Sequence, residues 1–421
     1  MHKSKKVELL APVGSFEALE AAINSGADSI YFGLDQLNMR TRSVNNFSIS
    51  DIPFLVKKCK NKNIKTYLTI NTIIYDHDLF LIKKIANNAK KFGIDAIIAM
   101  DQSIINYAKS INLKVHLSTQ LNITNIESIK FYSFFADTIV LSRELSLIQI
   151  KNIISNIKKN KILGPSGKLI KIEIFCHGAL CMAISGKCYL SFHSYNSSAN
   201  RGSCKQNCRK NYTLIEKTLI EKNSGIYLDV KNESLLSSKD LCTINFLDKI
   251  IDSGISLLKI EGRARSPEYV AKTTSCYREA IDLILKKKPI PESKINFWLQ
   301  KLNNVYNRGF YSGYYLGNKI EKWSTKNKVD FFYPKKKIYL GKVKNFYKKS
   351  MIGEFLIESF HLKLNDSIYI IGMKTGIKKT FVKSLMVNDI KTNIAFKGDL
   401  CTFPINFNIK LSDKLYKIIE K

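Results

Sequence analysis

Apolar and polar positions divide the first part of the chain into short strands and longer amphipathic helices. Apolar residues recur with a helical period in segments 15–25, 52–62, 79–92 and 145–158. These alternate with eight short runs rich in β-branched and aromatic residues, at 7–12, 29–33, 65–71, 96–101, 114–120, 138–144, 170–178 and 257–263. Strands that alternate with helices predict a parallel sheet and the fold class α/β. Eight such strands favour closure into a TIM-like (β/α)8 barrel.

One connection in this pattern is long, and the pattern of apolar and polar residues changes after the eighth strand. Residues from about 179 to 256 form a cysteine-bearing insertion, so the predicted barrel extends over 1–290. Residues 291–335 read as a helical and aromatic connector. In 336–421 short alternating stretches are separated by Gly and Asp turns, which predicts a small C-terminal β-barrel domain.

Polar residues gather where the predicted barrel strands end. Any one of them could simply cap a strand or a helix. As a set they indicate a functional site, because the carboxyl ends of barrel strands form the catalytic face of this fold. They are Asn71, Asp101, Gln120, Arg143, Glu144, His177, Glu261 and Arg263.

The net charge of +32 indicates attraction to polyanions such as nucleic acid. Lysines supply 58 of the 67 basic residues, so a nucleotide bias of the gene explains the excess equally well. The nine arginines are therefore the more informative cations. The N-terminus lacks a signal-peptide pattern, and no apolar run is long enough for a membrane helix. We expect a cytoplasmic protein without a membrane partner.

Four cysteines in the insertion, Cys181, Cys188, Cys204 and Cys208, carry the strongest chemical signal. Cysteines that cluster in a reducing compartment indicate a metal site. Four thiolates suit zinc or an iron–sulfur cluster. The first pair is spaced too widely for a zinc knuckle, which favours a 4Fe-4S cluster. Cys204 and Cys208 would share one face if their segment were helical.

The other five cysteines are expected to be less important for a metal site. Cys59, Cys276 and Cys401 lie in predicted helices or strands and read as small core residues. Cys176 and Cys242 lie nearer the four clustered cysteines. Either could substitute for one of the four as a ligand.

Several motifs resemble those of peptidase family U32, the collagenase-like protease family. Those nearest the cysteines are residues 173–181 (EIFCHGALC) and 185–191 (SGKCYLS). Further motifs along the chain are 8–12 (ELLAP), 141–145 (LSREL), 238–241 (SKDL) and 259–263 (KIEGR). The resemblance spans almost the whole chain.

Within that family the pattern looks like the members that hydroxylate the wobble uridine of tRNA to 5-hydroxyuridine with prephenate as oxygen source. The resemblance implies a 4Fe-4S cluster on the four clustered cysteines and the tRNA anticodon region as partner. Hydroxylation of rRNA or of a quinone precursor, and U32-type peptidase activity, remain alternatives. The peptidase alternative has little motif support, because the chain lacks a His-Glu-x-x-His zinc motif and a nucleophile elbow.

Prephenate is a dicarboxylate, and the planar guanidinium of arginine binds carboxylates with two hydrogen bonds. Arg143 and Arg263 at strand ends are the first candidates, followed by Arg40 and Arg42. His177 and Glu261 are the candidate catalytic residues for proton transfer. His177 could instead support the cluster, or imitate a Cys–His pair with Cys181.

The aromatic and basic segment 306–315 has two possible roles. It could stack on bases of the anticodon, or it could fill a space between domains. Both remain open from sequence.

Overall fold

A computed structural model describes residues 7–41, 46–210, 237–317 and 335–420. Eight parallel strands form the barrel, which closes because β9 pairs with both β1 and β7. This confirms the predicted α/β barrel. The strands are β1 (Glu8–Pro12), β2 (Ser29–Gly33), β3 (Lys65–Ile70), β4 (Ala96–Ala99), β5 (Val115–Leu117), β6 (Thr138–Val140), β7 (Lys171–Ala179) and β9 (Leu257–Ile260).

Helices cover the outside of the barrel, and each turns an apolar stripe toward the strands. Helix α3 shows the pattern clearly, since it buries Ile82, Ile85, Ala86 and Ala89 and ends at Gly93 in the left-handed conformation. No helix in the described ranges is long and apolar enough to cross a membrane. The barrel helices are α1 (Phe16–Asn24), α2 (Ile52–Lys60), α3 (Leu79–Phe92), α4 (Gln102–Ser110), α5 (Ile126–Tyr132), α6 (Leu147–Lys159) and α10 (Pro267–Leu285).

The predicted insertion lies between β7 and β9 and contains α7 (Leu190–Tyr195), β8 (Asp240–Cys242) and α9 (Leu247–Asp252). Strand β8 pairs antiparallel with the end of β7. Helix α9 buries Leu247, Ile250 and Ile251 and precedes β9, so it serves as the barrel helix of this unit.

The described part of the connector packs on the barrel. It contains α11 (Glu292–Asn303) and β10 (Phe310–Tyr311), and β10 pairs with β8 of the insertion. Tyr311 and Tyr315 are buried, and the Tyr315 hydroxyl donates a hydrogen bond of 2.7 Å to the carbonyl of Phe175. Segment 306–315 is therefore not an exposed stacking platform as a whole.

The C-terminal residues form the predicted separate β domain. Its main sheet is antiparallel, in the order β15-β14-β20-β11-β12-β19-β16-β17, and a second sheet pairs β13 with β18. No ladder in the described part joins β15 to β17, so hydrogen bonding leaves the main sheet open. The strands are β11 (Lys335–Tyr347), β12 (Ile352–Ile357), β13 (His361–Lys363), β14 (Ser367–Gly372), β15 (Gly376–Phe381), β16 (Met386–Val387), β17 (Ile390–Lys391), β18 (Ile394–Phe396), β19 (Leu400–Pro404) and β20 (Lys414–Glu420).

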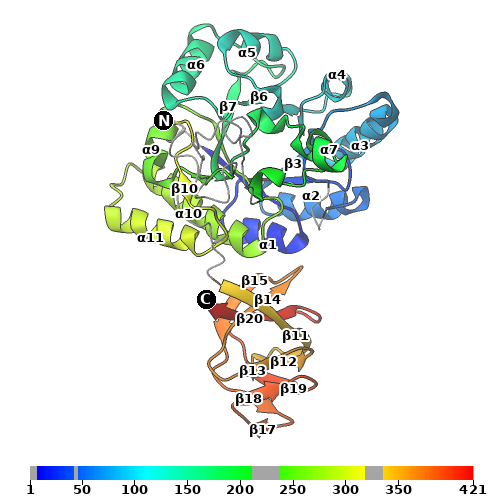
Figure 1. Ribbon diagram of the computed structural model, residues 1–421, viewed down its shortest axis with the longest axis vertical. Helices are drawn as coiled ribbons and strands as arrows, with labels where there is room; N and C mark the ends of the chain where they lie inside the picture. Colours follow the sequence, from blue (N-terminus) through cyan, green and yellow to red (C-terminus); the bar gives the residue numbers. More distant parts are fainter. Residues whose placement is uncertain (1–6, 42–45, 211–236, 318–334, 421) are drawn as a thin grey trace, which may run out of the picture.

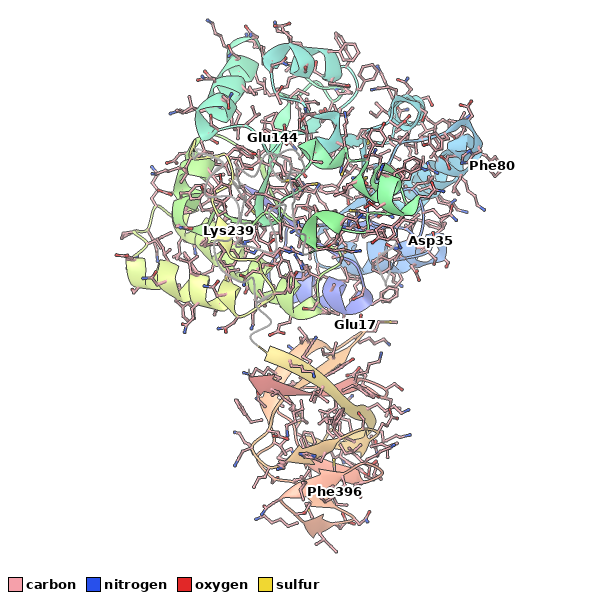
Figure 2. All side chains as sticks on the ribbon, viewed as in Figure 1. Glu17, Asp35, Phe80, Glu144, Lys239 and Phe396 are labelled. Carbon is pink, nitrogen blue, oxygen red and sulfur yellow. The ribbon has the colours of Figure 1, made fainter. Side chains whose placement is uncertain are left out.

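This domain contacts the barrel through α1 and α10 (Figure 1). The Tyr369 hydroxyl on β14 donates a hydrogen bond to Glu268 at the start of α10. Glu17 of α1 lies at the same boundary (Figure 2). The β domain is therefore attached to the barrel through these two outer helices.

A group of buried ionic side chains links β5, β7 and β9 inside the barrel. Glu173 is fully buried and accepts hydrogen bonds from Lys259 Nζ at 2.9 Å and from His116 Nδ1 at 3.1 Å. Burial acts to raise the pKa of Glu173, but Lys259 and His116 outweigh it and bring the pKa to about 2. His116 is thus a buried structural residue.

We expect Glu173→Gln to lower the free energy of unfolding by about 3 kcal/mol, because Lys259 would keep a buried charge without its counterion. Since the folded-state pKa of Glu173 lies below the ordinary value of 4.5, its stabilisation is complete above about pH 4.5. It is lost as the pH falls toward 2. Urea denaturation of both proteins should therefore show a difference that shrinks in acid.

The matched control is Glu127→Gln, which removes an exposed ion pair with Lys130. We expect a loss below about 1 kcal/mol for that variant. Equal losses for the two variants would contradict the structural role of Glu173.

Candidate active site

A cavity of about 430 Å³ opens at the carboxyl ends of the barrel strands. Its wall combines these strand ends with the insertion and the connector. Most of the polar residues predicted at strand ends line it, namely Asn71, Gln120, Arg143, Glu144, Glu261 and Arg263. Asp101 instead caps α4 by accepting a hydrogen bond from the backbone N–H of Ser103. The predicted catalytic face is therefore a real cavity.

Six of the nine arginines of the chain line this one cavity. The carboxylates on its wall are Glu144 and Glu261. Cations therefore exceed anions, which suits an anionic ligand. The six arginines are Arg40, Arg143, Arg209, Arg263, Arg265 and Arg308.

Arg40 and Glu261 form an ion pair across the cavity, with 3.0 Å between Nη2 and Oε1. Burial acts to raise the pKa of Glu261, but Arg40, Arg265 and Arg143 bring it to about 2. A carboxylate that stays ionised in this way cannot donate a proton at neutral pH and is a weak base. The geometry favours a role of Glu261 in orienting Arg40.

Arg263 is buried, and its Nη1 donates to Asn38 Oδ1 at 2.9 Å and to Thr69 Oγ1 at 2.6 Å. Burial lowers the pKa of Arg263 to about 10, so the side chain remains a cation at neutral pH. Asn38 also accepts a hydrogen bond from the backbone N–H of Arg40. Asn38 thus connects two candidate arginines, although its amide gave no sequence signal of its own.

Arg143 lies at the end of β6, where its guanidinium stacks 3.7 Å from the ring centre of Phe175. Its Nη1 donates to the carbonyl of Ala179 at 2.8 Å. These contacts fix the plane of the guanidinium at the cavity wall. Arg42, the fourth predicted substrate-binding residue, lies outside the described residues.

His177, the other candidate catalytic residue, is not among the residues that line the cavity. The pairing of β7 with β9 shifts register between Phe175 and His177. Such a bulge interrupts the alternation of side chains along a strand. His177 packs among Tyr269, Tyr277 and Phe310 instead. Burial lowers its pKa to about 3, so the imidazole is neutral and enclosed.

Arg265 and Arg308 form a second group of charges that was not predicted. Both bind the buried Asp240 of β8, at 3.7 Å and 3.1 Å, and both guanidinium groups lie over the ring of Tyr306. Sequence position could not place Arg308 here, because it follows the barrel by many residues. Its residue type was the available signal, since arginine is rare in this lysine-rich chain.

Three of the four predicted cluster cysteines, Cys181, Cys204 and Cys208, line the cavity. Cys188 lies beside them, and its backbone N–H donates to Asn200 Oδ1. The segment around Cys204 and Cys208 is not an α-helix, which corrects that expectation. Gln206 adopts a left-handed conformation with φ of 55° between them.

Backbone amides point at the sulfur atoms of this group. The N–H of Leu190 donates to Cys188 Sγ and that of Gln206 to Cys204 Sγ, both at 3.4 Å. Burial raises the pKa of Cys208, Arg209 lowers it, and the other three thiols raise it again. Cys181, Cys188 and Cys204 therefore lie close enough to Cys208 to act on its charge.

Among the residues that the structure describes, no three His, Cys, Asp or Glu side chains lie close enough to hold a single metal ion. A four-iron cluster keeps its thiolates farther apart than one tetrahedral ion does. Cys176 and Cys242 are buried and do not line the cavity, so the geometry offers no support for either as a substitute ligand. Cys59, Cys276 and Cys401 are buried, as core cysteines should be.

The sequence profile of peptidase family U32 matches residues 14–325. The chain belongs to this family. A protein named collagenase from Porphyromonas gingivalis is 45% identical to this U32 chain over 98% of both sequences. The tRNA hydroxylation protein P1 of Bacillus subtilis is 34% identical over 75% of the chain and 72% of that protein. The 23S rRNA 5-hydroxycytidine C2501 synthase of Escherichia coli is 35% identical over 68% of the chain and 41% of the enzyme.

Thiol accessibility in this U32 protein should separate the cluster cysteines from the rest. In the metal-free native protein we expect an alkylating reagent to modify the exposed Cys181 and Cys204 first, and the half-buried Cys188 and Cys208 more slowly. The remaining cysteines should react only after unfolding. Peptide mapping by mass spectrometry measures this order, and early labelling of Cys176 or Cys242 would contradict the geometry.

Proposed function

We propose that this U32 protein is an iron–sulfur enzyme that hydroxylates the wobble uridine of tRNA to 5-hydroxyuridine, with prephenate as oxygen source. The observation that carries the proposal is that three of the four clustered cysteines line one barrel-end cavity together with six arginines. Relatives named for tRNA hydroxylation and for rRNA 5-hydroxycytidine synthesis support the reaction class.

The residues proposed to hold a 4Fe-4S cluster are Cys181, Cys188, Cys204 and Cys208. Their chemistry fits, because four thiolates are the common ligand set of such a cluster and backbone N–H groups already point at two of the sulfurs. When bound, the cluster would supply one-electron transfer. The positive charge of Arg209 beside Cys208 would offset part of the negative charge of the thiolates.

Arg40, Arg143 and Arg263 are proposed to bind the two carboxylates of prephenate. All three guanidinium groups are already held by the protein. Arg40 is held by Glu261, and Arg263 by Asn38 and Thr69. Arg143 is held by Phe175 and the carbonyl of Ala179. A fixed guanidinium loses little conformational freedom on binding a ligand. These residues would orient the oxygen donor beside the cysteine group.

Peptidase activity is the competing function, because the relative at 45% identity is named collagenase. A cysteine peptidase needs a histidine beside its nucleophile. His177, the predicted partner of Cys181, is buried outside the cavity that Cys181 lines. The geometry therefore argues against a peptidase that uses Cys181 with His177.

The first test is anaerobic purification with iron and sulfide analysis and an absorption spectrum. We expect about four irons and four sulfides per chain, with broad visible absorption. Both should be lost in the double variant Cys181→Ala, Cys208→Ala. The double variant Cys59→Ala, Cys401→Ala is the control and should retain the iron. Stoichiometric zinc without iron would overturn the proposed iron–sulfur cluster. A structural metal site or peptidase activity would then be the preferred interpretation.

The second test measures 5-hydroxyuridine in tRNA by mass spectrometry, with and without prephenate. Arg143→Gln should raise the KM for prephenate about tenfold to a hundredfold, because one charge-assisted hydrogen-bonding group is lost. Arg278→Gln, which breaks an ion pair with Asp28 outside the cavity, should leave that KM unchanged. Equal prephenate KM values in wild type and Arg143→Gln would contradict the assigned role of Arg143.

A further inference from the structure

The insertion exposes a group of large apolar side chains next to the cavity. Tyr189, Phe192 and Tyr195 have 76%, 49% and 52% of their surface accessible. Met182 and Ile184 are also exposed, and both line the cavity itself. Solvent-exposed apolar clusters of this kind mark binding surfaces.

In the short helix α7 the buried side chain is polar and the exposed side chains are aromatic, which is the reverse of an ordinary surface helix. Its buried residue is Ser191, whose hydroxyl accepts a hydrogen bond from the N–H of Lys205 and lies 3.9 Å from Cys204 Sγ. Tyr189, Phe192 and Tyr195 recur every third residue and face solvent. One side of α7 thus supports the cysteine group while the other presents three aromatic rings.

The charge around these rings identifies the kind of partner. Residues 180–210 contain no Asp or Glu, and their basic residues are Lys187, Arg201, Lys205, Arg209 and Lys210. Lys210 Nζ lies 4.6 Å from the ring centre of Tyr195 and donates to its hydroxyl. Aromatic rings interleaved with cations are typical of surfaces that bind unpaired nucleic acid, where bases stack and phosphates pair with lysine.

We propose that Tyr189, Phe192 and Tyr195 form a stacking platform for the unpaired bases that flank the target nucleotide. This inference rests on the proposed function and narrows its substrate to RNA in an open loop. In the same insertion Met182 and Ile184 are exposed and line the arginine-rich cavity. A base displaced from the stacked row would therefore enter directly beside the cysteine group.

The position of the platform differs from the one indicated by sequence. Segment 306–315 was the aromatic candidate, but Tyr311 and Tyr315 are buried and Tyr306 and Tyr314 lie in the cavity wall. The rings of α7 are exposed and stand outside the cavity. They are thus placed to contact bases beyond the reacting one.

The test measures the affinity of the iron-loaded protein for an RNA stem–loop carrying the anticodon loop and for a fully paired RNA duplex. We expect the triple variant Tyr189→Ala, Phe192→Ala, Tyr195→Ala to bind the stem–loop about tenfold more weakly or worse, with little change for the duplex. The triple leucine variant keeps apolar area but removes stacking, so it should lose affinity as well. Phe131→Ala, Phe134→Ala, which removes exposed rings near α5, is the control and should bind like wild type.

Three results decide the proposal. Unchanged stem–loop affinity of the alanine variant would overturn the platform. Full affinity of the leucine variant would overturn stacking, because apolar area alone would then be sufficient for binding. If the triple variants lose iron, the single variant Phe192→Ala replaces them, because Phe192 adjoins no cysteine in sequence. We expect this variant to bind the stem–loop several-fold more weakly. An unchanged affinity would overturn the proposal. Hydroxylation of tRNA by the wild type is assayed separately, so failure of the proposed function is distinguished from failure of the platform.

Discussion

Repulsion among six guanidinium groups at one end of the barrel is the constraint that the site depends on. Each like-charged neighbour raises the free energy of the others, most strongly where water is excluded. Two buried or half-buried carboxylates oppose this repulsion, with Glu261 against Arg40 and Asp240 against Arg265 and Arg308. Glu261 directly follows β9, and Asp240 begins β8. Barrel closure and strand β8 are therefore both needed to bring these carboxylates close to the arginines.

Much of this arrangement was predictable, because strand ends in a closed barrel converge whatever the loops do. The rule that strand ends meet at one face of the barrel placed Arg143, Glu261 and Arg263 in the cavity correctly. It failed for His177, since a register shift in β7 depends on pairing with β9 and leaves no periodic signal in one strand. It could not find Arg308, which reaches the cavity only because the connector folds back on β8.

The cysteine group shows the same division between local and non-local information. Spacing alone identified the four residues, because their clustering is a property of the sequence. Their conformation was not predictable, since the left-handed Gln206 turns the segment without a glycine to signal it. The exposed rings of α7 escaped notice for a related reason. Apolar residues at helical spacing normally indicate a buried face, and only the structure shows which side of a short helix is covered.

The hydrogen bond from Tyr315 to the carbonyl of Phe175 and the pairing of β10 with β8 have a consequence for the order of assembly. During synthesis the barrel strands and the cysteine-bearing insertion leave the ribosome before Tyr306 and Arg308 do. The last wall of the cavity is therefore added after all eight barrel strands have emerged. Until then the cysteine group faces a wider opening than it does in the finished protein.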